Sequence, residues 1–248
     1  FGDLTLNILP VPVENLTLML HSDAAFGNAA REGTQGGYVI AAVDKSALLD
    51  MESPWSPSVW KTARLKRAVA ATLAGEVQTL ADGLGHMEWM MCLMCEALDA
   101  DFDPVDREKS FHRRPSIAVT DCKSAYDNVT SAGSPAKDKR TAIDVVIVRE
   151  TLARLGATLR WAPTNCQLAD GLTKDEARPI DLLRAVLRSG RYQLQDEAQH
   201  LRRAAEEKQR RQQRGVKANE RAKKAQREGR GQQSSESPEL ISAQYVAV

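Results

Sequence analysis

Asn15-Leu-Thr-Leu-Met-Leu-His-Ser-Asp23 is a short, mostly apolar run that is bounded by polar residues and ends on a carboxylate. Such a run is typical of a buried strand. Glycines predict turns at Gly27-Asn28 and at Gly33-Thr-Gln-Gly-Gly37, so Tyr38–Val43 is expected to be the returning strand of a hairpin. A third strand is expected around Ser58–Thr62, so the N-terminal part of the chain is predicted to be β structure.

Helical and strand patterns alternate in the rest of the chain. Ala, Leu and Met recur at i, i+3 and i+4 spacing from Ala68 to about Leu98, which predicts one long helix. The charged segment 99–115 contains two prolines and predicts a surface loop. The following elements are expected to be a strand (Ser116–Thr120), a helix (Lys123–Thr130), a loop (Ser131–Lys139), a helix ended by Gly156 (Thr141–Leu155), a strand (Ala157–Ala162) and a helix (Asp175–Ser189). This order, β-β-β-α-β-α-α-β-α, predicts an α/β fold with a mixed sheet and helices on its faces.

Charge is distributed unevenly along the 248 residues. The 34 basic and 33 acidic side chains give a net charge of +1, but residues 200–231 carry twelve Lys or Arg and only four Glu. Residues 1–199 hold 22 basic and 27 acidic side chains and are therefore acidic. We predict an N-terminal linker (1–14), one domain (15–190) and a basic, helical or largely disordered tail (191–248). The tail could bind nucleic acid by counterion release or serve as a solvated linker.

Several protein classes are excluded. The longest apolar run, Met87 to Leu98, is interrupted by Glu88 and Glu96 and is shorter than the roughly 18 residues of a membrane helix. No signal peptide is recognisable, and a chain that begins at Phe1 is expected to be a piece of a longer polypeptide. Four cysteines are too few for a disulfide framework, so a reduced intracellular setting is expected. Cys92-Leu-Met-Cys95 has half of a zinc-site spacing, but its Met-rich helical context favours core packing.

Four carboxylates stand at chemically informative positions. These are Asp23 at the first strand, Glu76 in the long helix, Asp121 at the end of the fourth strand and Asp170 before the last helix. Ligand sites in α/β sheets are usually built at strand ends. Phosphodiester hydrolysis through two divalent ions needs several carboxylates around ions ~4 Å apart, one helping to form the attacking hydroxide and one stabilising the leaving oxygen. Mg²⁺ prefers such oxygen ligands.

These acids lie in longer motifs that follow one another from about residue 20 to 175. The motifs are His21-Ser-Asp-Ala-Ala-Phe26 with Gly36-Gly37-Tyr38, Trp60-Lys-Thr-Ala-Arg-Leu-Lys-Arg67, Ala70-Ala-Thr-Leu-Ala-Gly-Glu76, Thr120-Asp-Cys-Lys-Ser-Ala125, Ile143-Asp144 with Arg149-Glu150, and Pro163-Thr-Asn-Cys-Gln-Leu-Ala-Asp-Gly-Leu-Thr-Lys174. Together they resemble the ribonuclease H domain of copia-type LTR retrotransposon Pol polyproteins. The closing run Gln167–Lys174 is the most specific part.

The resemblance implies a five-stranded mixed sheet, with three antiparallel strands, flanked by helices. It implies that the protein cleaves the RNA strand of RNA–DNA hybrids endonucleolytically and leaves a 3′-hydroxyl and a 5′-phosphate. It assigns Asp23, Glu76, Asp121 and Asp170 as catalytic, metal-binding acids for two Mg²⁺ ions, which Mn²⁺ could replace. The implied partners are the hybrid and an upstream reverse transcriptase domain in the same polyprotein, without a membrane. The implied location is a cytoplasmic retroelement particle or the nucleus.

Two departures from the family concern histidine. The family often has His where Ala142 stands, and cellular relatives use a mobile His ahead of the last Asp. The sequence has no His between His112 and Asp170. Product release is therefore expected to be slower or to rely on Asn165 or water.

A basic cluster, Lys61, Arg64, Lys66 and Arg67, lies between the third strand and the long helix. It predicts contacts to phosphates of the hybrid, with a solvated turn as the alternative. Polar groups near Ser124 and backbone groups after the first strand are candidates for sensing the RNA 2′-hydroxyl.

Other polar residues have structural interpretations. Asp144 is expected to be a helix cap or an ion-pair partner, and Asp170 could be a helix N-cap instead of a metal ligand. Strand alternation predicts that His21 points to the face opposite Asp23.

Three functions remain open at this point. The leading one is the hybrid-specific ribonuclease. The second is an inactive retroelement remnant or a nucleic-acid-binding module of the same fold. The third is an integrase-like or transposase-like nuclease, which typically uses three acids and lacks the Ala-Asp-Gly-Leu-Thr-Lys ending.

Overall fold

The computed structural model describes residues 5–29, 33–133, 136, 138–195, 197–199, 201–202, 206 and 209–210. Phe1–Glu197 belong to one compact unit, and the residues from Ala198 onward belong to a second. Most of the predicted basic tail lies outside the described residues. Among the described helices, none is long and apolar enough to span a membrane.

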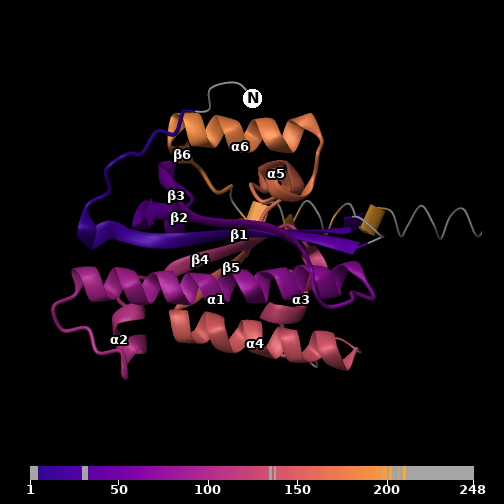
Figure 1. The fold of residues 1–248 in the computed structure, drawn as a ribbon, viewed down its shortest axis with the longest axis horizontal. Coiled ribbons are helices and arrows are strands. Elements are labelled where there is room, and N and C mark those ends of the chain that lie inside the picture. The colour runs from indigo at the N-terminus through magenta and orange to yellow at the C-terminus, as the bar shows by residue number, and fades with distance from the viewer. Residues whose placement is uncertain are drawn as a thin grey trace, which may run out of the picture. The chain divides into compact units, whose positions relative to one another are not determined.

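A six-stranded mixed sheet organises the first unit, with the strand order β5-β4-β1-β2-β3-β6 (Figure 1). Its members are β1 (Leu16–Ala29), β2 (Gly33–Asp44), β3 (Ser53–Arg64), β4 (Ser116–Thr120), β5 (Ala157–Trp161) and β6 (Arg191–Tyr192). The first three strands are antiparallel, whereas β4 runs parallel to both β1 and β5. This is the RNase H-like arrangement expected from the sequence, and the short β6, paired with the start of β3, adds a sixth strand.

Helices cover both faces of the sheet (Figure 1). One face carries α1 (Thr72–Leu98), α2 (Arg107–Phe111), α3 (Lys123–Thr130) and α4 (Lys139–Leu155), and the other carries α5 (Asp170–Thr173) and α6 (Ala177–Ser189). Three expectations need correction. The long helix begins at Thr72, and the last helix at Ala177. The expected loop 99–115 contains α2, which forms because Phe111 is fully buried in the core.

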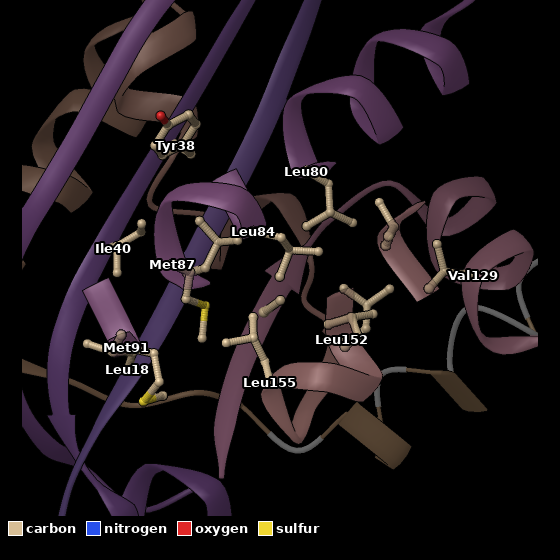
Figure 2. Packing of buried hydrophobic residues seen from close by; sticks show 14 of the residues in the cluster. Leu18, Tyr38, Ile40, Leu80, Leu84, Met87, Met91, Val129, Leu152 and Leu155 are labelled. Carbon is tan, nitrogen blue, oxygen red and sulfur yellow. The ribbon is translucent and has the colours of Figure 1, made fainter. Parts of the chain in front are cut away.

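The larger core lies between the sheet and α1 and α4. Leu80, Leu84, Met87 and Met91 of α1 recur at helical spacing and are essentially unexposed. Figure 2 shows them packed with side chains of β1, β2 and α4. Cys95 continues the same stripe, and burial raises the pKa of its thiol to about 11. The core-packing interpretation of the two helical cysteines is therefore favoured.

Two predicted turns in the first hairpin are wrong. The strand β1 continues through Gly27, which has a φ of 71° in an irregular stretch of the β1–β2 pairing, and Gly33–Gly37 belongs to β2. A Cβ on Gly36 would lie 2.6 Å from Oγ1 of Thr79, and a Cβ on Gly37 would lie 2.7 Å from Cγ2 of Thr173. These glycines are needed because α1 and α5 approach β2 closely from opposite faces.

Candidate active site

Four elements bring the predicted acids together. Asp23 lies on β1 opposite Gly37, Glu76 lies in the second turn of α1, Asp121 directly follows β4, and Asp170 begins α5. Asp23, Glu76 and Asp121 each offer a carboxylate oxygen, and these three atoms lie within 4.8 Å of one another. We call these three residues together with Asp170 the acid cluster.

The sheet and the first turn of α1 explain this convergence. The parallel register of β1 and β4 pairs His21 with Val119, so Asp23, inside β1, is level with Asp121, which directly follows β4. Glu76 follows Gly75, where a Cβ would lie 3.4 Å from the Cβ of Ala24 on β1. The helix therefore begins directly on the strand that carries Asp23.

Asp170 joins the cluster through Lys174. The Lys174 ammonium nitrogen lies 2.7 Å from Oδ2 of Asp170 and 4.0 Å from Oδ1 of Asp23. Thr173, which directly precedes Lys174, donates a hydrogen bond to Oδ2 of Asp23. The Asp170 side chain is only 1% exposed and does not cap α5, whose N-cap residue is Ala169, so the N-cap interpretation is wrong.

Burial and mutual repulsion make the ionised cluster unfavourable on its own. Burial, and then the charges of Asp23 and Asp121, raise the pKa of Glu76 to about 9. Burial and then the charge of Asp23 raise the pKa of Asp170 to about 7, and the same two causes raise the pKa of Asp121. Such a group of carboxylates is stabilised by cations.

The donor chemistry fits divalent metal ions. Oε2 of Glu76 and Oδ1 of Asp170 are buried and have no hydrogen-bond partner among the described residues. All four acids offer the oxygen ligands that Mg²⁺ prefers. Metal-binding carboxylates are expected to be buried beside one another, with oxygens that accept no hydrogen bond from the protein.

Sequence reasoning assigned no role to Lys174 or Thr173, although both stand in the most specific motif. The i, i+4 spacing of Asp170 and Lys174 is the spacing of a helical ion pair and could have identified Lys174. Nothing in the sequence pattern indicates the hydrogen bond from Thr173 to Asp23, because α5 and β1 are far apart along the chain.

His21 lies two residues before Asp23 on β1 and therefore points to the same face of the strand, so the predicted opposite orientation is wrong. Its Nδ1 is 2.9 Å from Oε1 of Gln167, and its ring packs edge-on against Tyr192 at 5.1 Å between centroids. Burial lowers the pKa of His21 to about 4, so the imidazole is neutral at physiological pH. His21 is a core residue.

The basic cluster divides between a cavity and an ion pair. Lys61, Arg64 and Lys66 line a cavity of about 290 Å³ between β2, β3 and the side of α1. The Lys61 ammonium lies 2.6 Å from Oδ2 of Asp82, and both side chains are partly exposed. Arg67 is not among the residues that line this cavity and forms an ion pair with Asp144 of α4.

The other two candidate substrate contacts are exposed near the acids. Ser124 lies in the first turn of α3, with its Oγ 3.2 Å from Sγ of Cys122. Asn165 lies in a 3₁₀ turn, Thr164–Cys166, and lines a cavity of about 570 Å³ together with Asp170 and Lys174. Both residues are exposed.

Neither a protein-family model nor a curated protein sequence matches the chain. Among solved structures, the N-terminal RNase H domain of a Mycobacterium tuberculosis protein, fused to maltose-binding protein, has a TM-score of 0.42 and 15% identity, over 64% of this chain and 97% of that one. The RNase H1 of the archaeon Halobacterium salinarum has a TM-score of 0.41 and 16% identity, over 63% and 93%. A foamy virus protease–reverse transcriptase in complex with an RNA/DNA hybrid has a TM-score of 0.36 and 11% identity, over 67% of this chain and 21% of that one. Because all three TM-scores are below 0.5, these similarities support no conclusion about function, which is inferred from the site residues.

Proposed function

We propose that this chain is a metal-dependent ribonuclease H that hydrolyses the RNA strand of RNA–DNA hybrids. The observation that carries the proposal is the convergence of Asp23, Glu76 and Asp121, whose carboxylate oxygens lie within 4.8 Å of one another although they come from three separate elements. The motif resemblance supports hybrid specificity and a copia-type Pol polyprotein with an upstream reverse transcriptase domain. It also supports a location in a cytoplasmic retroelement particle or the nucleus.

Asp23, Glu76, Asp121 and Asp170 would hold two Mg²⁺ ions, or Mn²⁺ in their place. When bound, the ions supply the positive charge that activates the attacking water and stabilises the leaving oxygen. The chain contributes the geometry. The hydrogen bond from Thr173 fixes the orientation of the Asp23 carboxylate, and the parallel pairing of β1 with β4 holds Asp121 beside it.

Substrate recognition is proposed for exposed polar groups around the acid cluster. Lys61, Arg64 and Lys66 would bind phosphates of one strand of the hybrid, because their three cationic side chains line one cavity. Ser124 would contact the RNA 2′-hydroxyl, the group that distinguishes RNA from DNA. Asn165, in the cavity next to Asp170, would assist departure of the product.

The test compares labelled RNA–DNA hybrid, RNA duplex and DNA duplex, each with Mg²⁺ or EDTA. We expect cleavage of the RNA strand of the hybrid alone, only with Mg²⁺, giving 3′-hydroxyl and 5′-phosphate ends. Binding of the hybrid without cleavage would instead indicate an inactive remnant or a nucleic-acid-binding module. Cleavage of duplex DNA would indicate a different nuclease on this fold.

A further inference from the structure

One ion pair ties the segment between β3 and α1 to α4. Arg67 donates a hydrogen bond from its guanidinium group to Oδ2 of Asp144, 77 positions further along the chain. The Arg67 side chain is 44% exposed, whereas the Asp144 side chain is only 8% exposed. A carboxylate at that depth depends on its cation, because a buried charge without a partner is strongly unfavourable.

Asp144 does not cap α4. That role belongs to Asp138, whose carboxylate accepts a hydrogen bond from the backbone N–H of Thr141 at 2.8 Å. Asp144 lies inside the helix, so of its two predicted roles the ion pair is confirmed and the cap is wrong. Its carboxylate therefore holds a residue of another element.

The start of α1 depends on contacts from outside the helix. Its N-cap residue is Ala71, which has no side-chain acceptor for the first backbone N–H groups. On the sheet side the helix is fixed by close packing at Gly75, where a Cβ would lie 3.1 Å from a β2 side chain. The segment just before the helix is tied to α4 by the Arg67–Asp144 pair.

Glu76 follows this start directly. Its Oε2 has no hydrogen-bond partner among the described residues, so its position is set by the backbone of α1 more than by its own contacts. A small movement of the first turn would therefore move Glu76 relative to Asp23 and Asp121. Misplacement of a reacting group by about 1 Å can cost on the order of a hundredfold in rate.

We propose that Arg67 is a positioning residue for Glu76 that acts through Asp144, and that it does not contact the nucleic acid. The kinetic part of this inference rests on the proposed ribonuclease activity. Loss of either partner would loosen the start of α1 and lower turnover at saturating hybrid, with little effect on hybrid affinity. If Arg67 contacted a phosphate, its replacement would instead weaken hybrid binding and flatten the salt dependence of binding, and replacement of Asp144 would have neither effect.

The test is a double-mutant cycle with Arg67→Met, Asp144→Asn and the double variant. Arg113→Met is the matched control, because the Arg113 side chain is also 44% exposed and its partners, Asp101 at 3.0 Å and Asp99 at 3.7 Å, lie at the other end of α1 from Glu76. We expect each single variant to lower kcat about tenfold, a barrier change of about 1.4 kcal/mol, with hybrid Kd in Ca²⁺ unchanged. The double variant should be no slower than the slower single variant, because the two residues act as a unit. Arg113→Met should keep the wild-type kcat.

Amide hydrogen exchange supplies a readout that needs no activity. Residues 73–80 should lose protection in Arg67→Met and Asp144→Asn but not in Arg113→Met, with β1 as the internal reference for an intact fold. The positioning role is overturned if the kcat losses of the two single variants add up in the double variant. It is also overturned if Arg67→Met binds the hybrid more weakly while Asp144→Asn binds it as the wild type does. If the wild-type protein cleaves no hybrid, the proposed function fails and hydrogen exchange alone tests the positioning role of Arg67. Unchanged protection in both single variants would then overturn that role.

Discussion

Lys174 and Asp170 form a salt bridge of 2.7 Å within the acid cluster. The same ammonium lies 4.0 Å from Asp23, and the Asp170 side chain is almost completely buried. One cation from the chain thus neutralises part of a site whose acids repel one another. The metal-free protein depends on this lysine for charge balance.

Lys174→Met should therefore destabilise the metal-free protein. We expect a loss of about 1–3 kcal/mol in unfolding free energy at pH 8 in EDTA, because a buried carboxylate loses a charged partner. Saturating Mg²⁺ should reduce the difference, since bound ions supply the missing charge. Arg178→Met is the control, because Arg178 lines the cavity beside Asp170 that Lys174 also lines, and it has no ion pair among the described residues. Thermal unfolding of both variants measures the effect, and equal losses would contradict it.

The raised carboxyl pKa values predict how stability depends on pH. Glu76 has a pKa of about 9 in the folded protein and an ordinary carboxyl pKa near 4 when unfolded. The folded state therefore holds a proton that the unfolded chain releases, and stability falls as pH rises through the folded pKa. In EDTA, the melting temperature should decrease from about pH 7 to pH 9, a range in which His21 is neutral.

Glu76→Gln supplies the control for this pH dependence, because glutamine does not titrate. Its melting temperature should vary less between pH 7 and 9, and Mg²⁺ should flatten the wild-type curve in the same way. A wild-type melting temperature that rises with pH in EDTA would contradict the assigned direction of the Glu76 pKa.

Gly37→Ala should disturb the element that carries Asp170. The added methyl would lie 2.7 Å from Cγ2 of Thr173 and 3.1 Å from Cβ of Leu172, so α5 must move away from β2. We expect a loss of about 1–3 kcal/mol in stability and slower hybrid cleavage. Gly85→Ala, on an exposed position of α1 with no heavy atom within 4 Å, should instead stabilise by about 0.5–1 kcal/mol. Chemical denaturation measures both, and a neutral Gly37→Ala would show that the contact is soft.

Local sequence patterns predicted those parts of the fold in which one short segment determines one element. The bounds of β4 and α3 agree with the expectation, because each is a short uniform pattern between polar flanks. The position of Asp121 at a strand end was also predictable, whereas Asp23 lies inside β1, which continues to Ala29, and meets Asp121 through the parallel register of the two strands.

Features that depend on tertiary contacts could not be predicted in this way. Gly33–Gly37 has the composition of a turn, but close approach of two helices requires the glycines within a strand. The strand β6 has only two residues and exists through its pairing with β3. Arg67 and Asp144 each stand in a recognised motif, yet no local pattern joins positions 77 residues apart.

The basic segment 200–231 should increase hybrid affinity without changing catalysis. Truncation after Gln199 removes twelve Lys or Arg and six acidic residues, which leaves an acidic chain to bind a polyanion. We expect weaker hybrid binding and a logarithmic salt slope that is flatter by roughly 0.7–0.9 per lost phosphate contact. The kcat at saturating hybrid should hardly change. Fluorescence anisotropy of both proteins across a salt series measures this, and identical slopes would identify the tail as a solvated linker.

The Asp121→Asn variant tests the proposed metal site most directly. Its turnover of a labelled hybrid is measured in Mg²⁺, and its binding of the hybrid is measured in Ca²⁺. Asparagine keeps the shape and one oxygen of Asp121 but removes the charge that the ions require. Asp127→Asn, an exposed acid on α3 outside the acid cluster, is the matched control. We predict that Asp121→Asn binds the hybrid normally and loses cleavage, while Asp127→Asn cleaves as the wild type does. Retention of more than about a tenth of wild-type turnover by Asp121→Asn, a barrier change below about 1.4 kcal/mol, would contradict an essential metal ligand at this position.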